Sequence, residues 1–190
     1  MSYIETVPES EASGELGELY RRFGNGDGSV DNVLKVHSLN PPSLAAHCAL
    51  YTQSMHRPSP VSRAEREMVG VAVSRANGCA YCLEHHAAGL ERLLPEDRRE
   101  IAGALKAGDV SGLSARERAM VRYSQKLTRD PASMARDDVE ALRDEGLTDR
   151  EILDVCQAAA YFAYANRIVL GLGAALGQGE GGAGHWPAEG

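Results

Sequence analysis

The sequence lacks several features that would place it at a membrane or on nucleic acid. It has no apolar run of the ~20 residues that a transmembrane helix needs. Its first residues, MSYIETVPES, have neither the basic nor the apolar stretch of a signal peptide. Acidic residues outnumber basic ones, and the net charge of −7 argues against nucleic acid or an anionic membrane as a partner. These absences predict a cytoplasmic protein with no membrane and no nucleic-acid partner.

Cysteine is also scarce, with four residues in a chain of 190. In a reducing compartment so few cysteines do not form a disulfide framework. Two of them, Cys79 and Cys82, form a CxxC pair, which in a cytoplasmic protein is more often catalytic or metal-binding. Cys48 and Cys156 lie in apolar helical stretches and are expected to be buried, unreactive thiols.

Strand signals are weak, and helix signals dominate. Only residues 29–39 fit an extended segment, and they fit a helix equally well. Capping boxes of the S/T-x-x-E type begin at Ser62, Ser114 and Thr148, and each precedes a periodic apolar run. The predicted fold class is therefore all-α. Helices are expected near residues 13–23, 42–56, 63–76, 79–93, 96–107, 115–128, 135–145 and 149–173.

A single domain is expected over residues 1–176, followed by a Gly-rich tail at 177–190. The stretches SRAEREMV (62–69) and SARERAMV (114–121) share five residue types at matching positions. They suggest an internal duplication of a helical unit, although two similar amphipathic helices with similar caps would look the same. Only the first copy is followed by CxxC, so the core CxxC unit is predicted at about 42–107.

The stretch NGCAYCLEHH (77–86) concentrates the reactive residues. Its Asn-Gly pair is a helix breaker, so Cys79 is expected near a helix N-terminus, where the partial positive charge favours a thiolate. At about 100° per residue, Cys79, Cys82 and His86 point within ~60° of one another. His85 is placed about 100° from His86, off that face.

Several kinds of site compete for this stretch. A c-type haem requires C-x-x-C-H, and Leu83 stands where the histidine would be. One short helix cannot surround a zinc ion with four ligands, and the sequence has no second CxxC. A thioredoxin-like motif requires a βαβ context, which is absent. A redox pair is favoured, and a structural metal site and an inert core pair remain alternatives. Three further histidines have no partner at a useful spacing and are expected to be structural: His37, His47 and His56.

Glu67 lies twelve residues before Cys79. If the chain reverses at the Asn-Gly pair, Glu67 and His86 become level on two antiparallel helices. Glu67 would then orient His86, which would shuttle the proton of Cys82. The alternative is a solvated first-turn glutamate beside Arg63 or Arg66.

With this pattern (Glu67, the cysteine pair around Ala80-Tyr81, and His86) the chain resembles the carboxymuconolactone decarboxylase-like superfamily, specifically its AhpD-like (alkylhydroperoxidase) peroxidase-related branch. The ending YFAYANRIVLGLG (161–173) also looks like a family feature. The resemblance spans about residues 15–175. It implies an AhpD-like helical bundle that assembles into a homo-oligomer, as a dimer, trimer or hexamer. The apolar character of residues 155–176 agrees with a central or intersubunit position for the last helix.

The resemblance also implies a thiol peroxidase that uses no cofactor, metal or haem. Cys82 would attack a hydroperoxide substrate, and Cys79 would resolve the sulfenic acid to a disulfide. Glu67 and His86 would form the proton relay, and a dithiol or lipoyl-type reductant would restore the thiols. The best-studied members carry a second histidine where this chain has Tyr81, and a phenol is a poorer base near neutral pH. Tyr81 and His85 are thus possible supporting residues. The implied peroxidase has an alternative, a thiol–disulfide exchanger or redox sensor on the same scaffold.

Overall fold

The computed structural model describes residues 2–175, so the predicted tail at 177–190 lies outside the described part. Over residues 2–175 the chain forms nine α-helices and no strand, which confirms the all-α prediction. The helices are α1 (Gly14–Phe23), α2 (Asn32–Lys35), α3 (Pro41–Tyr51), α4 (Arg63–Ala76), α5 (Ala80–Leu93), α6 (Glu100–Ala107), α7 (Ala115–Arg129), α8 (Arg136–Asp144) and α9 (Asp149–Leu172). None of them is long and apolar enough to cross a membrane.

The three predicted capping boxes are all formed, at the starts of α4, α7 and α9. In each, the Ser or Thr side chain accepts from a backbone N–H, and the glutamate three residues on accepts in return. Arg116 joins two of these boxes, with its Nε 2.8 Å from Glu65 and its Nη2 2.7 Å from Glu151. The starts of three helices are therefore linked through charged side chains.

The predicted internal duplication stays a prediction. Helices α4 and α7 begin at equivalent capping boxes, as that idea requires. However, α4 is followed by the 14-residue α5, whereas α7 is followed by a 3₁₀ turn and the 9-residue α8.

Two segments differ in detail from the sequence-based expectation. The stretch 29–39 contains the short helix α2 and no strand. The helix expected at 42–56 is α-helical only as far as Tyr51 and then forms a turn of π-helix over Thr52–His56. Such turns widen the helix locally, and they occur often at functional sites.

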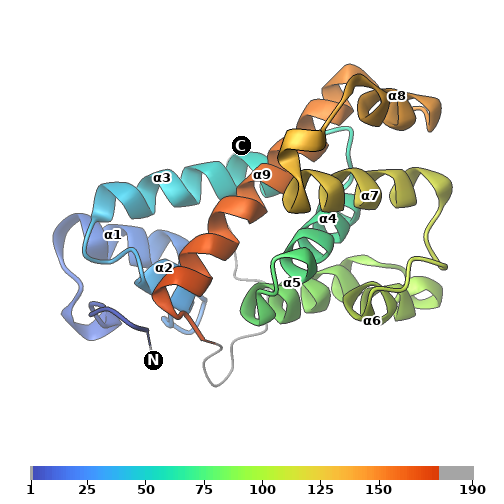
Figure 1. The fold of residues 1–190 in the computed structure, drawn as a ribbon. Helices are drawn as coiled ribbons and strands as arrows, with labels where there is room; N and C mark the ends of the chain where they lie inside the picture. Colours follow the sequence, from blue (N-terminus) through green and yellow to red (C-terminus); the bar gives the residue numbers. More distant parts are fainter. Residues whose placement is uncertain (1, 176–190) are drawn as a thin grey trace.

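The turn between α4 and α5 places the cysteines. Gly78 has φ +69°, a conformation that favours glycine. The Cys79 N–H donates to the Ser74 carbonyl at 2.9 Å and the Gly78 N–H to the Arg75 carbonyl at 3.2 Å, which is the Schellman pattern. Cys79 is also the N-cap residue of α5. It therefore ends one helix and begins the next, and α4 and α5 lie side by side as predicted (Figure 1).

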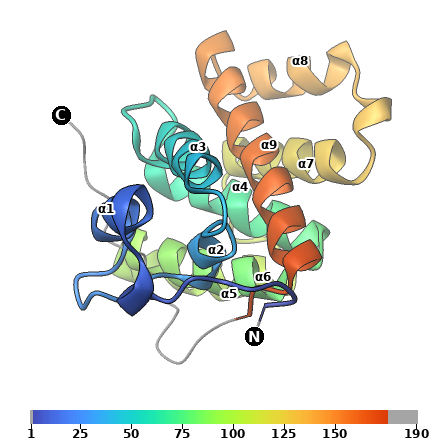
Figure 2. The ribbon, with the colours of Figure 1, turned by 90° about the vertical axis from the view of Figure 1, so that its left-hand side faces the viewer.

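Helix α9 runs diagonally across the molecule, between the group α1–α3 and the group α4–α8 (Figure 1). Phe162 of α9 is buried against α4, where Gly70 leaves room for its ring. In Figure 2 the N-terminal segment passes beside the C-terminal end of α9. The Tyr3 N–H donates to the Leu172 carbonyl at 2.8 Å, and the Tyr3 ring covers Gly173.

Candidate functional site

The two CxxC sulfur atoms lie 2.7 Å apart as free thiols, and both residues are buried. They share one hydrogen bond. This bond lowers the pKa of Cys79, and the Cys82 backbone N–H lowers it further, against the opposing effect of burial. The same shared bond, followed by burial, raises the pKa of Cys82. Within the pair, the shared hydrogen bond thus favours the thiolate on Cys79 and the thiol on Cys82.

Asn166 of α9 supports this pair from the other side. Its side chain is fully buried, its Oδ1 accepts from Asn77 Nδ2 at 2.9 Å, and its Nδ2 donates to Ser74 Oγ at 3.3 Å. The Asn166 side chain also hydrogen-bonds the Cys82 thiol and opposes the rise in its pKa. Asn166 was not among the residues predicted for the site, although an amide inside an apolar helix signals a buried polar contact.

Glu67 and His86 meet as the antiparallel arrangement requires. Glu67 Oε2 lies 2.7 Å from His86 Nδ1, and Glu67 Oε1 lies 3.2 Å from Arg63 Nη2. Glu67 is buried, which disfavours its charged form, but His86 and Arg63 outweigh burial and hold its pKa below the usual range. The carboxylate is therefore an ionised, desolvated group between the His86 ring and the Arg63 guanidinium, and the solvated alternative does not apply.

Arg63 extends the chain of contacts to the π turn after α3. Its Nη1 donates to His56 Nδ1 at 3.0 Å. Burial, reinforced by Arg63, lowers the pKa of His56 to about 4, so this imidazole is neutral at pH 7 and acts as an acceptor. Sequence spacing alone gave His56 no partner.

A small cavity of about 30 Å³ opens beside these groups. Its wall includes Cys82, His86, Tyr81 and His85, whereas Cys79 does not line it. Since His86 Nδ1 faces Glu67, the remaining ring nitrogen, Nε2, is the one available to the cavity. A cavity of this size has room for about two water molecules, so a peroxide group fits beside the Cys82 sulfur.

Two more buried histidines line the same cavity. Burial, followed by the charge of His86, lowers the pKa of His85 to about 4, and burial lowers that of His47 to about 3. The Nδ1 atoms of both rings have no hydrogen-bond partner among the described residues. His85 stacks with Tyr81 at a centroid distance of 6.3 Å. Both rings are neutral, and His85 reaches the cavity although the helical wheel placed it off the cysteine face.

The other two cysteines, Cys48 and Cys156, do not line the cavity beside Cys82. Cys48 is buried, and burial raises its pKa to about 12, as expected of an unreactive thiol. Cys156 is only half-buried. In the described range 2–175, no group of three or more His, Cys, Asp or Glu side chains has the geometry to hold a metal ion.

Comparison with known proteins adds family context to this geometry. The Carboxymuconolactone decarboxylase family model matches residues 41–126, which contain Glu67, Cys79, Cys82 and His86. No curated protein sequence matches the chain.

Solved structures match over nearly the whole chain. A peroxidase-related protein of Silicibacter sp. TM1040 is 30% identical, with a TM-score of 0.85 over 95% of this chain and 94% of the other. A peroxidase-related protein with an alkylhydroperoxidase AhpD core, from Ralstonia eutropha JMP134, is 25% identical, with a TM-score of 0.84 over 95% and 94%. The debrominase Bmp8 shares the fold at 17% identity, with a TM-score of 0.76 over 90% of each chain. On the family match and the similarity to the Silicibacter protein, the chain belongs to the carboxymuconolactone decarboxylase family, in its AhpD-like, peroxidase-related branch.

Proposed function

We propose that this protein is a thiol peroxidase that reduces hydroperoxides with the Cys79–Cys82 pair. The observation that carries the proposal is the combination of two thiols 2.7 Å apart with a cavity lined by Cys82 and His86, the latter held by buried Glu67. Similarity to peroxidase-related proteins supports the same reaction class.

The residues divide the chemistry between them. His86 takes the proton of Cys82 through the cavity, and Glu67 stabilises the imidazolium that results. The Cys82 thiolate attacks the terminal peroxide oxygen, the O–O bond breaks, and the alkoxide takes the proton from His86. Cys82 is now a sulfenic acid. The Cys79 thiolate attacks the Cys82 sulfur, hydroxide leaves and is protonated to water, and a disulfide joins the pair.

The presence of Tyr81 supports an alternative to peroxidase activity. It lines the cavity where the best-studied relatives would have a histidine, and it cannot act as a base near neutral pH. A protein with an intact cysteine pair and a weakened relay would act as a thiol–disulfide exchanger or redox sensor. Such a protein would form the disulfide once and turn over poorly.

The test is hydroperoxide consumption with dihydrolipoamide as reductant, for the wild type beside Cys82→Ser, Cys79→Ser and Cys48→Ser. We expect turnover in the wild type and in Cys48→Ser, because Cys48 is a buried thiol outside the site. We expect none in the other two variants. If the wild type does not consume hydroperoxide but its two thiols still oxidise to a disulfide, the protein is a thiol–disulfide exchanger and not a peroxidase.

The proposal extends to assembly and location. Helices α3 and α9 leave Leu50, Leu153 and Leu170 between 44% and 51% exposed, which supports burial against further copies of the chain in a homo-oligomer. A dithiol reductant is available in the cytoplasm, where we place the reaction. We also retain the single domain over residues 1–176, with its CxxC unit at about 42–107.

A further inference from the structure

The cavity beside Cys82 is large enough for a peroxide group but too small for the dithiol reductant. Its volume of about 30 Å³ has room for about two oxygen-sized atoms. A dithiol that reduces a disulfide must bring one sulfur into contact with a disulfide sulfur and keep a second sulfur close behind it. A molecule with two thiols on a carbon chain does not fit this cavity. The reductant therefore needs another approach to the pair.

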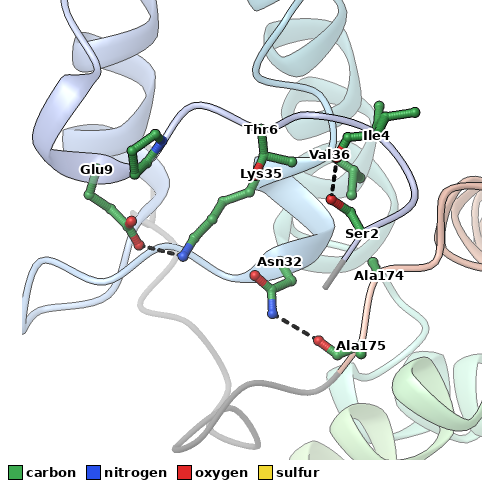
Figure 3. A pocket seen from close by; sticks show the side chains of 10 residues that line it. Ser2, Ile4, Thr6, Glu9, Asn32, Lys35, Val36, Ala174 and Ala175 are labelled. Atoms are coloured by element: carbon green, nitrogen blue, oxygen red, sulfur yellow. Dashed lines mark hydrogen bonds and ion pairs between the residues drawn. The ribbon is translucent and has the colours of Figure 1, made fainter.

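A second hollow, of about 500 Å³, lies beside the N-terminal segment. Figure 3 shows its wall, which combines Ser2, Ile4 and Thr6 of that segment, Asn32 and Lys35 of α2, and the chain just after α9. A volume of this order is typical of sites for small organic ligands.

The hollow and the cysteine pair share a wall. Val36 and Ala174 line the hollow, and both belong to the apolar cluster that contains Cys79 and Cys82. Cys79 is itself fully buried and lies outside the wall of the Cys82 cavity. One apolar layer, formed by this cluster, thus borders both the hollow and the cysteine pair.

The part of this layer that follows α9 is held by few interactions. The helix ends at Leu172, and Gly173 adopts the left-handed conformation with φ +67°. Beyond it, the Ala174 N–H still donates to a carbonyl of α9, and the Ala175 carbonyl accepts from Asn32 Nδ2 at 2.8 Å. Moving Ala174 aside breaks two hydrogen bonds and leaves α9 intact.

We propose that the 500 Å³ hollow is the docking site of the dithiol reductant, which reaches Cys79 by displacing Ala174. This inference rests on the proposed redox function of the pair and assigns the peroxide and the reductant to separate hollows. The occupant is a compact, uncharged dithiol of the dihydrolipoyl kind. Among the described residues that line the hollow, only Lys35 and Glu9 are charged, and they pair at 2.7 Å, so these residues offer no unpaired charge to an ionic ligand.

The dithiol reduces the Cys79–Cys82 disulfide in two steps. A thiolate of the dithiol bonds to the Cys79 sulfur, the Cys79–Cys82 bond breaks, and Cys82 leaves as a thiolate that the Asn166 amide stabilises before it is protonated. The second thiol of the reductant, as its thiolate, attacks the reductant sulfur of the mixed disulfide and releases Cys79. The reductant leaves as a cyclic disulfide, and the protein has gained two electrons and two protons.

The experiment measures the two half-reactions separately by rapid mixing. Oxidation of the thiols is followed with hydrogen peroxide, and reduction is followed with dihydrolipoamide on protein oxidised by diamide. Ala175→Trp fills the hollow at an exposed position outside any helix. Ala141→Trp is the matched control, because it places the same side chain in a hollow of about 540 Å³ lined by α7 and α8, which shares no residue with the cysteine cluster. Val33→Phe narrows the Cys82 cavity instead.

We expect Ala175→Trp to slow reduction roughly tenfold, by blocking the position from which the dithiol attacks, and to leave oxidation unchanged. Ala141→Trp should change neither rate, and Val33→Phe should slow oxidation only. Equal reduction rates in Ala175→Trp and Ala141→Trp would overturn the proposal, as would reduction slowed only by Val33→Phe. Because diamide forms the disulfide without peroxide, a failure of peroxidase activity would leave this test valid and its result separate.

Discussion

At the scale of single residues, the site depends on a buried carboxylate. Glu67 remains ionised in the core because His86 and Arg63 contact its two oxygens from opposite sides. The cost of burying this charge is offset by hydrogen bonds from the Arg63 guanidinium and the His86 ring. The same contact orients the His86 ring and fixes its tautomer, because the Glu67 carboxylate accepts a hydrogen bond from Nδ1.

Glu67→Gln removes the charge of this residue and keeps nearly the same shape, so it tests whether the reaction needs the charge. The amide can still hydrogen-bond His86, but it cannot stabilise the imidazolium. We therefore expect peroxide turnover to fall by about 10²-fold while the disulfide still forms with diamide. Stopped-flow oxidation at several pH values measures the change. Glu84→Gln, at an exposed position on α5, is the control and should retain the wild-type rate. A Glu67→Gln variant with full activity would remove the relay from the mechanism.

Asn166→Leu tests the contact that the sequence did not reveal. The amide is hydrogen-bonded to the Cys82 thiol, so its loss should raise the pKa of that thiol and slow its oxidation, roughly tenfold. The pH dependence of thiol alkylation, followed by mass spectrometry at each cysteine, gives the pKa directly. Asn77→Ala removes only the donor to Asn166 Oδ1 and should leave that pKa nearly unchanged. If Asn166→Leu and the wild type have the same alkylation profile, Asn166 contributes only to packing and not to the pKa of Cys82.

At the scale of helices, the site is placed by the contacts of α4 with its neighbours. Gly70 of α4 allows the Phe162 ring of α9 to lie directly on the helix. That ring contacts His86 edge-on at 4.5 Å between centroids. The packing of α4 on α9 thus sets the position of the imidazole between Glu67 and the cavity.

Gly70→Ala should disturb both packing and catalysis. An added Cβ would lie 2.5 Å from Phe162 Cζ, so this ring, which contacts His86, must shift. We expect a loss of about 1–3 kcal/mol in the free energy of unfolding, measured with urea, and a lower rate of thiol oxidation. Gly103→Ala in α6 has no atom within 4 Å of the new Cβ and should stabilise the protein by about 0.5–1 kcal/mol. Equal stabilities of the two variants would contradict this account of the α4–α9 contact.

At the scale of the whole molecule, the linked helix starts make stability depend on pH. Hydrogen bonds from Thr148, followed by Arg116, lower the pKa of Glu151 from 4.5 to about 2. Because the folded value lies below the unfolded value, this contribution is complete above about pH 4.5 and is lost as the pH falls towards 2. The capping box of α9 should therefore weaken in acid.

Glu151→Gln tests this pH dependence. The variant should be less stable than the wild type by roughly 1 kcal/mol at pH 7, and the difference should shrink between pH 4.5 and 3. Urea unfolding at each pH measures it, and the exposed Glu145→Gln should track the wild type throughout. A difference that stays constant from pH 7 to 3 would exclude the Glu151 titration as its source.

Much of this arrangement was predictable because it is encoded locally. Capping boxes at Ser62, Ser114 and Thr148 fix helix starts within a few residues, and the Asn-Gly pair fixes the reversal that brings Glu67 to His86. The positions of Asn166 and His47 were not predictable in this way. Asn166 reaches the site through the packing of α9 against α4 and α5, and His47 through its contact with Tyr161 of α9, so both depend on contacts between residues far apart in the sequence. Periodicity reports which face of a helix is apolar but not which helix covers it.

The proposed assignment of peroxide and dithiol to separate hollows has a kinetic consequence. In a ping-pong enzyme with one shared site, an excess of either substrate occupies the form of the enzyme that the other requires. Under the proposed arrangement, peroxide meets the pair at Cys82 and dithiol meets it at Cys79, so neither excludes the other. Turnover at high dithiol concentration should then level off instead of declining, and the enzyme keeps its capacity for peroxide when its reductant is plentiful.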